Sequence, residues 1–224
     1  MINPARSGGR FFSLDGIDGC GKSTQCRLLA DWLRGRGYKV VQCADPGGTP
    51  IGDALRDLLL NDRYKNISLR CELFLFMASR AQLVAQVIRR ALEWGEVVVC
   101  DRFLLANVVY QGHGGNLLYS PYGDDIDEDL LWDIGRFATR GIEPDLTLVL
   151  DLPEDVALSR RNRPPDRMES RPASYHGWIR EGFLVEARRQ PDRIHIIDAS
   201  PPIEVVQQRI REEVERVLEA GPRT

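Results

Sequence analysis

Residues 16–23 read GIDGCGKS and decide the fold, because they match the phosphate-binding pattern G-x-x-x-x-G-K-[ST]. An apolar segment at 11–15 precedes the motif and an amphipathic segment at 22–34 follows it, so the motif joins a predicted strand to a predicted helix. The glycines let successive backbone N–H groups face a polyphosphate, and the helix N-terminus adds a positive dipole. Lys22 is placed for the β- and γ-phosphates and the Ser23 hydroxyl for Mg²⁺. The stretch predicts a protein that binds a nucleoside triphosphate.

Lysine is rare in this chain, which makes the motif more specific. Of the 30 basic residues, only Lys22, Lys39 and Lys65 are lysine. The alternative interpretation is a glycine-rich turn that merely precedes a helix, and the scarcity of lysine weighs against it.

Outward from the motif, short apolar runs alternate with longer amphipathic stretches. Strands are predicted at 11–15, 38–43, 97–101, 146–151 and 193–198, and helices at 22–34, 51–60, 68–94, 126–140, 153–161 and 202–218. Two of the strands are nearly continuous apolar, as expected for parallel strands that are covered on both faces. The order predicts an α/β fold with a five-stranded parallel sheet flanked by helices and right-handed crossovers.

Aspartate ends four of the five predicted strands, at Asp15, Asp101, Asp151 and Asp198. Ligands of open parallel sheets gather at the carboxyl ends of the strands. Aspartate is also a common residue at strand ends, so we expect two of the four, at most three, to be functional.

Two segments interrupt the alternation of strands and helices. Residues 111–129 contain HGG and PYG, which predicts a long loop. Residues 160–171 carry five arginines around two consecutive prolines, which predicts a mobile basic flap.

Composition excludes several classes of protein. The chain has 224 residues, of which 43% are hydrophobic, and its net charge of −3 argues against a basic footprint for duplex nucleic acid. No apolar run approaches the roughly 18 residues of a membrane helix, and residues 1–10 lack the apolar region of a signal peptide. The five cysteines, with neither disulfide-framework nor zinc spacing, indicate reduced thiols in a cytoplasmic protein: Cys20, Cys26, Cys43, Cys71 and Cys100.

The class of nucleotide-binding protein follows from what accompanies the motif. No Asn-Lys pair exists for the base-reading segment of a regulatory GTPase, and no LSGGQ segment of a transporter ATPase is present. Asp101 and Arg102 end the third predicted strand, and the flap adds further arginines. An acid beside the loop can hold magnesium, and arginines can neutralise a second phosphate group. This combination favours phosphoryl transfer to an acceptor.

A resemblance to a known family extends along nearly the whole chain. The segment FSLDGIDGCGKST at 12–24 resembles the opening of thymidylate kinases, the nucleoside monophosphate kinases that make dTDP from dTMP. The likeness continues, in the family's order, through DPGGT at 45–49, ASRAQ at 78–82, DRF at 101–103, NVVYQ at 107–111, PDLTL at 144–148, DRME at 166–169 and IDA at 197–199. The resemblance implies one P-loop nucleoside monophosphate kinase domain over 1–224, with a small arginine-rich lid at about 160–172.

On the acceptor side, the resemblance implies that Phe76 stacks on the thymine ring and that Arg80 hydrogen-bonds the base. The two residues are four apart and share one helix face. Core packing is the alternative for Phe76, which lies in a continuously apolar run. The remaining implied substrate residues are Arg102 for the acceptor phosphate, Asp18 near the sugar, and Asn107, Tyr110 and Gln111 around the nucleotide. The Tyr110 ring would disfavour a 2′-hydroxyl, with a core aromatic as its alternative.

On the donor side, the resemblance implies ATP with Mg²⁺. ATP would be bound by Gly16, Asp18, Gly19, Cys20, Gly21, Lys22, Ser23 and Thr24, and the metal by Ser23 and Asp101. The catalytic set would be Lys22, Asp101, Arg102, Arg160 and Arg163. Because Gly19 holds the loop position that carries an arginine in other members, the flap must supply one, as in the bacterial type. Its candidates are Arg160, Arg161, Arg163 and Arg167, led by Arg160 and Arg163.

Several positions depart from the family's usual pattern. Asp15 and Asp45 replace glutamates, Ala44 replaces an arginine, Ala106 replaces a serine, and residues 116–125 look like an insertion. These changes leave room for an altered acceptor preference or a slow enzyme.

The prediction is Mg²⁺-dependent transfer of the ATP γ-phosphoryl group to dTMP by a cytoplasmic homodimer with no nucleic-acid or membrane partner. Two alternatives stay open. One is a kinase for another pyrimidine nucleotide or a deoxynucleoside, and the other is a non-catalytic ATP-binding sensor.

Overall fold

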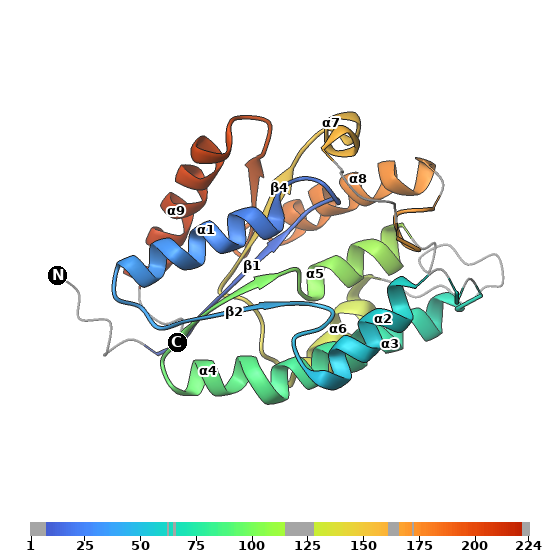
Figure 1. The fold of residues 1–224 in the computed structure, drawn as a ribbon, viewed down its shortest axis with the longest axis horizontal. Helices are drawn as coiled ribbons and strands as arrows, with labels where there is room; N and C mark the ends of the chain where they lie inside the picture. The colour runs from blue at the N-terminus through green and yellow to red at the C-terminus, as the bar shows by residue number, and fades with distance from the viewer. Residues whose placement is uncertain are drawn as a thin grey trace.

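Five parallel strands form one twisted sheet in the order β2-β3-β1-β4-β5 (Figure 1). Their bounds are β1 Arg10–Asp15, β2 Val40–Ala44, β3 Val97–Asp101, β4 Leu146–Asp151 and β5 Ile194–Asp198. The structure is a computed structural model that describes residues 8–61, 63–64, 66–114, 128–160, 166–171 and 173–220. The predicted five-stranded parallel α/β fold is confirmed.

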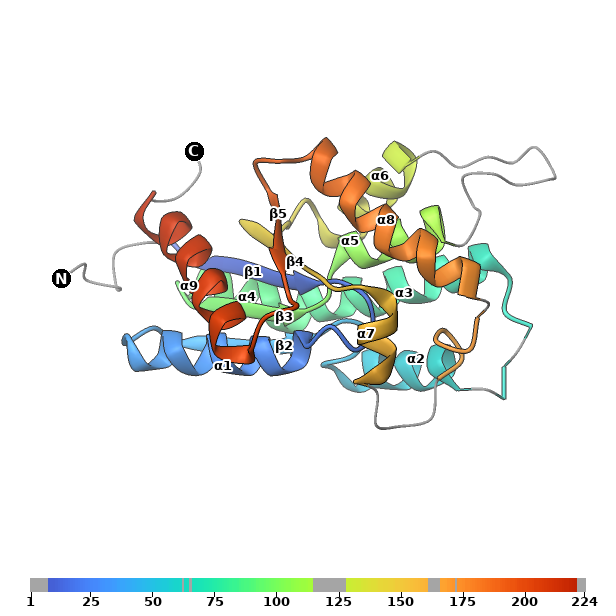
Figure 2. The same ribbon diagram turned by 90° about the horizontal axis from the view of Figure 1, so that it is seen from above.

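Helices cover both faces of the sheet (Figures 1 and 2). Helices α1 (Lys22–Gly35) and α9 (Ile203–Glu219) pack together on one face. The other face carries α3 (Leu69–Leu83), η2 (Val84–Ile88), α4 (Arg89–Glu93), α5 (Leu104–Asn107), η3 (Val108–His113) and α8 (Ala173–Arg189). Helices α2 (Pro50–Leu60) and α6 (Glu128–Thr139) pack against α3, and the short α7 (Glu154–Ser159) follows β4.

The central strands are held by burial and by one internal polar contact. All six residues of β1 are buried, because β1 lies between two other strands and under helices on both faces. Ser13 and Thr147, on neighbouring strands, join their hydroxyls at 2.8 Å, so neither oxygen is left unpaired in the core. Because all five strands are parallel, their carboxyl ends lie along one edge of the sheet, and the phosphate-binding motif lies at this edge.

Two helices begin at side-chain caps that their sequences provide. The Thr49 hydroxyl accepts a hydrogen bond from Gly52 N at 3.0 Å and starts α2, whose first residue is Pro50. The Ser68 hydroxyl accepts from Cys71 N at 3.3 Å and starts α3. These caps fix the ends of the two helices that later wall the acceptor pocket.

The segment Leu69–Glu93 is one continuous helix through α3, η2 and α4. By length and composition alone it could cross a membrane, with a mean hydropathy of 1.3, although the sequence analysis found no such run. Of its most apolar window, 44% is buried inside the protein, and core helices often meet the same test.

The predicted loop at 111–129 is wrong at both of its ends. Residues 111–113 complete the π-helical turn η3, and α6 begins at Glu128. The helix from Leu104 to His113 was missed because Val108, Val109 and Gly112 are poor helix formers. Residues 115–127, which include the proposed insertion at 116–125, lie outside the described residues.

Candidate active site

The glycine-rich loop between β1 and α1 adopts the backbone that the motif predicts. Gly16, Gly19 and Gly21 have φ angles of 134°, 90° and 100°, which residues with a side chain seldom adopt. A Cβ on Gly19 would lie 2.3 Å from the carbonyl oxygen of Ala157 in α7. The loop position that carries an arginine in other members is thus closed to any side chain here. This packing supports a flap as the source of a further arginine.

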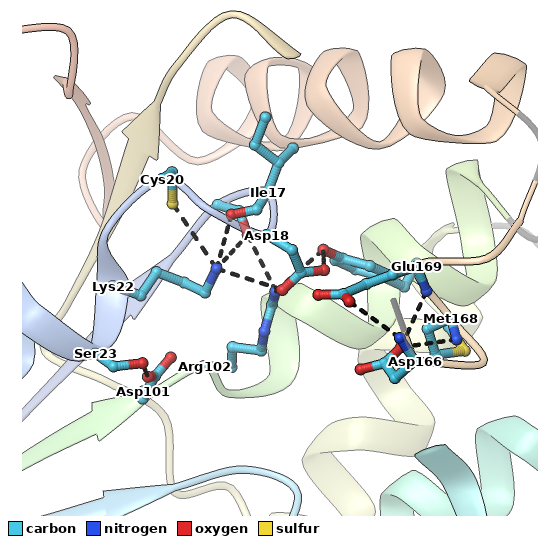
Figure 3. Close-up of polar contacts among 12 residues, drawn as sticks. Ile17, Asp18, Cys20, Lys22, Ser23, Asp101, Arg102, Asp166, Met168 and Glu169 are labelled. Atoms are coloured by element: carbon cyan, nitrogen blue, oxygen red, sulfur yellow. Dashed lines mark hydrogen bonds and ion pairs between the residues drawn. The ribbon is translucent and has the colours of Figure 1, made fainter. Parts of the chain in front are cut away.

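Lys22, at the first position of α1, turns its amino group back over the loop (Figure 3). Its Nζ donates to the carbonyl oxygens of Ile17 at 2.8 Å and Gly16 at 3.2 Å, and lies 3.8 Å from a carboxylate oxygen of Asp18. The side chain is 7% exposed, so the loop holds one buried positive charge at its centre. A polyphosphate in the loop would meet this charge directly.

Ser23 and Asp101, the two predicted ligands of Mg²⁺, lie within hydrogen-bond distance of each other. The Ser23 hydroxyl, in the first turn of α1, donates to Asp101 Oδ2, at the carboxyl end of β3, at 2.5 Å (Figure 3). Two hard oxygen ligands beside a phosphate loop fit Mg²⁺, which usually takes one or two protein oxygens and completes its shell with phosphates and water. Among the described residues, no group of three or more His, Cys, Asp or Glu side chains could hold a metal ion. Mg²⁺ does not need such a group, because phosphates and water supply most of its ligands.

A cavity of about 920 Å³ opens above the loop. Residues 18–25 form its floor and residues 199–203, between β5 and α9, form a side wall. Arg160, at the end of α7, lines the same cavity and donates from Nη1 to the carbonyl oxygen of Ala199 at 3.4 Å. The structure thus brings Arg160 together with the phosphate loop. Arg163 and Arg161 lie outside the described residues.

Arg102 is the centre of a charged cluster next to the loop. It has a φ of 70°, and its guanidinium donates to Asp18 Oδ1 at 2.5 Å, Gly16 O at 3.1 Å and the Tyr110 hydroxyl at 3.1 Å. The Tyr110 hydroxyl in turn donates to the other Asp18 oxygen at 3.1 Å. Burial raises the pKa of Asp18, but the charges of Arg102 and Lys22 outweigh it and hold this pKa well below its usual range.

A second pocket, of about 100 Å³, adjoins the cavity on the far side of Arg102. Every residue that the sequence analysis assigned to the acceptor lines it: Asp18, Phe76, Arg80, Arg102, Asn107, Tyr110 and Gln111. Phe76 and Arg80 reach it from α3, and Tyr110 and Gln111 reach it from η3. Asn107 comes from α5, Arg102 from the end of β3 and Asp18 from the glycine-rich loop. The departures Ala44 and Ala106 line the cavity and the pocket respectively, so both fall where they could alter a substrate contact.

Arg80 is fixed in the pocket wall by neighbours that satisfy part of its guanidinium. Its Nε donates to Asp45 Oδ2 at 2.6 Å and its Nη2 to the carbonyl oxygen of Phe103 at 3.2 Å. Arg80 is 1% exposed and its guanidinium lies over the Phe103 ring. Asp45 therefore acts first as the partner of this buried arginine, which explains why an acid precedes Pro46.

Two further side chains at or near the site were not predicted from the sequence. Arg56, from α2, lines both the cavity and the pocket and donates from Nη1 to the carbonyl oxygen of Pro46 at 2.8 Å. Glu72, from α3, is fully buried and binds Arg167, one of the four candidate flap arginines, at 2.6 Å. In the sequence, Arg56 cannot be distinguished from any surface arginine of an amphipathic helix, so no signal identified it. An isolated glutamate in an apolar run was the one available signal for Glu72.

Replacing Gly19 with alanine is expected to raise the KM for ATP by at least about tenfold, because the new Cβ would collide with Ala157 O and shift the loop or α7. Steady-state kinetics at saturating acceptor measure this. Gly37 is the matched control, since it has the same φ of 90° with open space around it, and Gly37→Ala should keep the KM for ATP. A Gly19→Ala enzyme with the wild-type KM would contradict the packing argument.

Replacing Asp15 with asparagine is expected to change how stability depends on pH. Asp15 is fully buried, and burial raises its pKa to about 7 despite the opposing charges of Arg102 and Lys22. The native state therefore holds a proton that the unfolded state loses near pH 3.8, so the wild-type protein loses stability as pH rises between these values. The uncharged variant escapes this loss.

Urea unfolding at several pH values measures the effect. The stability of Asp15→Asn relative to the wild type should increase by about 2 to 3 kcal/mol between pH 5 and pH 8. A difference that stays constant across this range would show that Asp15 does not titrate there.

Known proteins are similar to this chain in sequence and in fold. A sequence model of the family described as "Thymidylate kinase" matches residues 14–210. A thymidylate kinase of Rhodopirellula baltica is 45% identical over 90% of this chain and 78% of its own length, and one of Symbiobacterium thermophilum is 43% identical over 93% and 94%. The crystal structure of thymidylate kinase from Ehrlichia chaffeensis, 27% identical, superposes with a TM-score of 0.73 over 93% of this chain and 99% of its own. The phosphate loop and the two adjoining pockets are the features expected of such an enzyme. Together with the family match and these relatives, they show that the chain belongs to the thymidylate kinase family.

Proposed function

We propose that this protein transfers the γ-phosphoryl group of ATP to dTMP, giving ADP and dTDP. The observation that carries the proposal is that the two cavities adjoin and share four lining residues, Asp18, Asp45, Arg56 and Arg102. One cavity contains the phosphate loop, and the other has an aromatic ring and a guanidinium suited to a flat base. A donor and an acceptor bound in them would bring their phosphates together at Arg56 and Arg102.

On the donor side, the loop N–H groups and Lys22 would bind the β- and γ-phosphates of ATP. Ser23 and Asp101 would hold Mg²⁺, which, when bound, neutralises negative charge on the phosphate oxygens. Residues 199–203 would border the nucleoside, since they line the same cavity as the phosphate loop.

On the acceptor side, Arg102 and Arg56 would hold the phosphate of dTMP, because a guanidinium fork matches phosphate oxygens. Phe76 would stack on the thymine, with Arg80, Asn107 and Gln111 at its edge. The Tyr110 hydroxyl is held by Asp18 and Arg102, so the ring is fixed where it would crowd a 2′-hydroxyl.

The reaction needs no general base, because the attacking phosphate oxygen of dTMP is already ionised at neutral pH. That oxygen forms a bond to the γ-phosphorus while the bond from this phosphorus to the β,γ-bridging oxygen breaks, and ADP leaves. The work of the protein is to align the groups and to neutralise charge with Lys22, Arg102 and a lid arginine. Among the described residues, Arg160 is the candidate for the lid arginine, and Arg163 remains the other candidate.

A homodimer is the second part of this proposal. Two aromatic side chains are unusually exposed on neighbouring helices: Phe74 on α3 is 59% exposed and Phe137 on α6 is 88% exposed. A second copy would cover such a face, and light scattering of the purified protein measures the mass. The five free thiols fit a cytoplasmic enzyme.

The test is release of ADP with ATP and Mg²⁺ and a panel of acceptors: dTMP, dUMP, UMP, CMP, GMP and thymidine. Preference for dTMP is the expected result. Turnover with another acceptor alone would keep the kinase and discard the thymine pocket. ATP binding without turnover on any acceptor would favour a nucleotide sensor.

A further inference from the structure

Glu72 is a fully buried carboxylate that receives four hydrogen bonds. Arg167 Nη2 donates to Oε2 at 2.6 Å, Arg171 Nη2 donates to Oε2 at 2.7 Å and Oε1 at 2.9 Å, and Gln111 Nε2 donates to Oε1 at 2.9 Å. Its partners come from two sides. The arginines belong to the turn 166–171, and Gln111 belongs to the wall of the acceptor pocket. Glu72 itself lines neither cavity.

The two guanidinium groups decide how Gln111 is oriented. With both arginines donating to it, Glu72 is a carboxylate that can only accept hydrogen bonds. Gln111 must therefore present its amide NH₂ to Glu72 and its carbonyl oxygen in the other direction. That oxygen accepts from Asn107 Nδ2 at 2.6 Å.

The orientation of Gln111 in turn fixes Asn107. Because Nδ2 of Asn107 is used by Gln111, its Oδ1 is the atom left over. This oxygen is buried, Asn107 is 2% exposed and lines the acceptor pocket, and Oδ1 has no hydrogen-bond partner among the described residues. A buried acceptor without a partner is costly unless a ligand supplies the donor.

We propose that Glu72 is a positioning residue for the hydrogen-bonded chain Glu72–Gln111–Asn107, here called the relay. Glu72 sets which side chain donates and which accepts at each step, so that Asn107 offers a hydrogen-bond acceptor to the base. This proposal rests on the proposed function, and it would explain how the enzyme distinguishes acceptor bases by their N3 atom. The N3 atom of thymine or uracil carries a hydrogen and donates, whereas N3 of cytosine has none and accepts. A relay fixed in this direction favours dTMP and dUMP over dCMP.

The same carboxylate holds one wall of the pocket. Arg167 Nε also donates to the carbonyl oxygen of Leu59 at 2.6 Å, and Asp166 and Met168, on either side of Arg167, line the acceptor pocket. Releasing the arginines from Glu72 would therefore loosen the turn as well as the relay.

The test compares kcat/KM for dTMP, dUMP and dCMP in the wild type and in Glu72→Gln. In this variant the arginines retain the one remaining side-chain oxygen, so the new amide NH₂ faces Gln111 and reverses the relay. Asn107 would then offer its NH₂ to the base. The dTMP-to-dCMP ratio should fall by at least about tenfold, while the dTMP-to-dUMP ratio stays constant because both bases carry N3–H.

A double variant separates direction from simple loss of the carboxylate. In Glu72→Gln/Gln111→Glu, the new amide at position 72 donates to the new carboxylate at position 111, which again accepts from Asn107 Nδ2. The original direction returns, and the dTMP-to-dCMP ratio should recover to within about threefold of the wild type. Trypsin cleavage after Arg167 and Arg171 should be faster than in the wild type in both variants, because the turn has lost the negative charge that both guanidinium groups bind.

Glu186→Gln is the matched control. Glu186 is equally buried on α8 and binds Arg189 at 3.1 Å and Trp132 at 3.0 Å, but it lines neither cavity. It should lose stability without any change in the selectivity ratios.

An unchanged dTMP-to-dCMP ratio in a folded Glu72→Gln enzyme would overturn the inference, and so would an equal fall in Glu186→Gln. If Glu72→Gln does not fold, a folded double variant whose ratio stays tenfold low overturns it as well. Failure of the proposed function is a separate result, because the wild type would then not phosphorylate dTMP. Calorimetric binding of dTMP and dCMP to the same variants would still test the relay.

Discussion

Arg102→Ala should lower kcat/KM for dTMP by about a thousandfold, with a much smaller effect on the KM for ATP. The guanidinium lines both cavities where they join and, with Arg56, would face both the acceptor phosphate and the transferring phosphoryl group. It is already oriented by Asp18, Gly16 and Tyr110 and held at a φ of 70°. Such strain persists only where the surrounding contacts impose it, so this charge is fixed before substrate binds.

Two comparison variants make the result specific. Arg102→Lys keeps a positive charge but loses the planar fork, and should recover about a tenth of the wild-type kcat/KM or less. Arg180→Ala removes another arginine paired with an aspartate, at 2.7 and 2.9 Å from Asp151, but away from both cavities. It should retain the wild-type kcat/KM. A loss in Arg180→Ala as large as that in Arg102→Ala would mean that destabilisation, and not a lost phosphate contact, explains both.

Lys22→Ala should lower kcat by a factor of about 10² to 10³ and weaken ATP binding. Lys22 is the one buried lysine in the described part of the chain, and its amino group is held over the loop by the carbonyl oxygens of Gly16 and Ile17. Without it, the charge that develops on the β- and γ-phosphates has lost its nearest fixed cation inside the loop.

Lys39 provides the control, because it is exposed just before β2 and lines neither cavity. Lys39→Ala should match the wild type in kcat and in the KM for ATP. Steady-state kinetics over a range of ATP concentrations, with circular dichroism to verify folding, decide the comparison. If Lys22→Ala retained more than half of the wild-type kcat, the loop would not be the site of phosphoryl transfer.

Local patterns predicted the sheet and the phosphate loop well. The strands at 97–101 and 146–151 have the predicted bounds, because continuous apolar runs between turns leave little choice of register or length. The acceptor residues also came together in one pocket, although only the family resemblance, and not spacing, linked residues as far apart as Phe76 and Tyr110.

Features that depend on long-range contacts could not be predicted. The turn η3 is π-helical, so its side chains do not follow the 3.6-residue period, and the segment 104–113 showed no helical pattern. Arg167 was one of four candidate flap arginines in the sequence, a set led by Arg160 and Arg163, but a buried carboxylate 95 positions away binds it. A sequence shows the charge of such a residue but not its partner.

Transfer of label from ATP to dTMP tests most directly whether the two adjoining cavities carry out phosphoryl transfer. ATP carrying ¹⁸O on its γ-phosphoryl group is incubated with dTMP, Mg²⁺ and the protein, and the products are weighed by mass spectrometry. We expect the labelled phosphoryl group to appear in dTDP, in equal amount to the ADP formed. Label found only in inorganic phosphate, or ATP bound without any ADP formed, would contradict it.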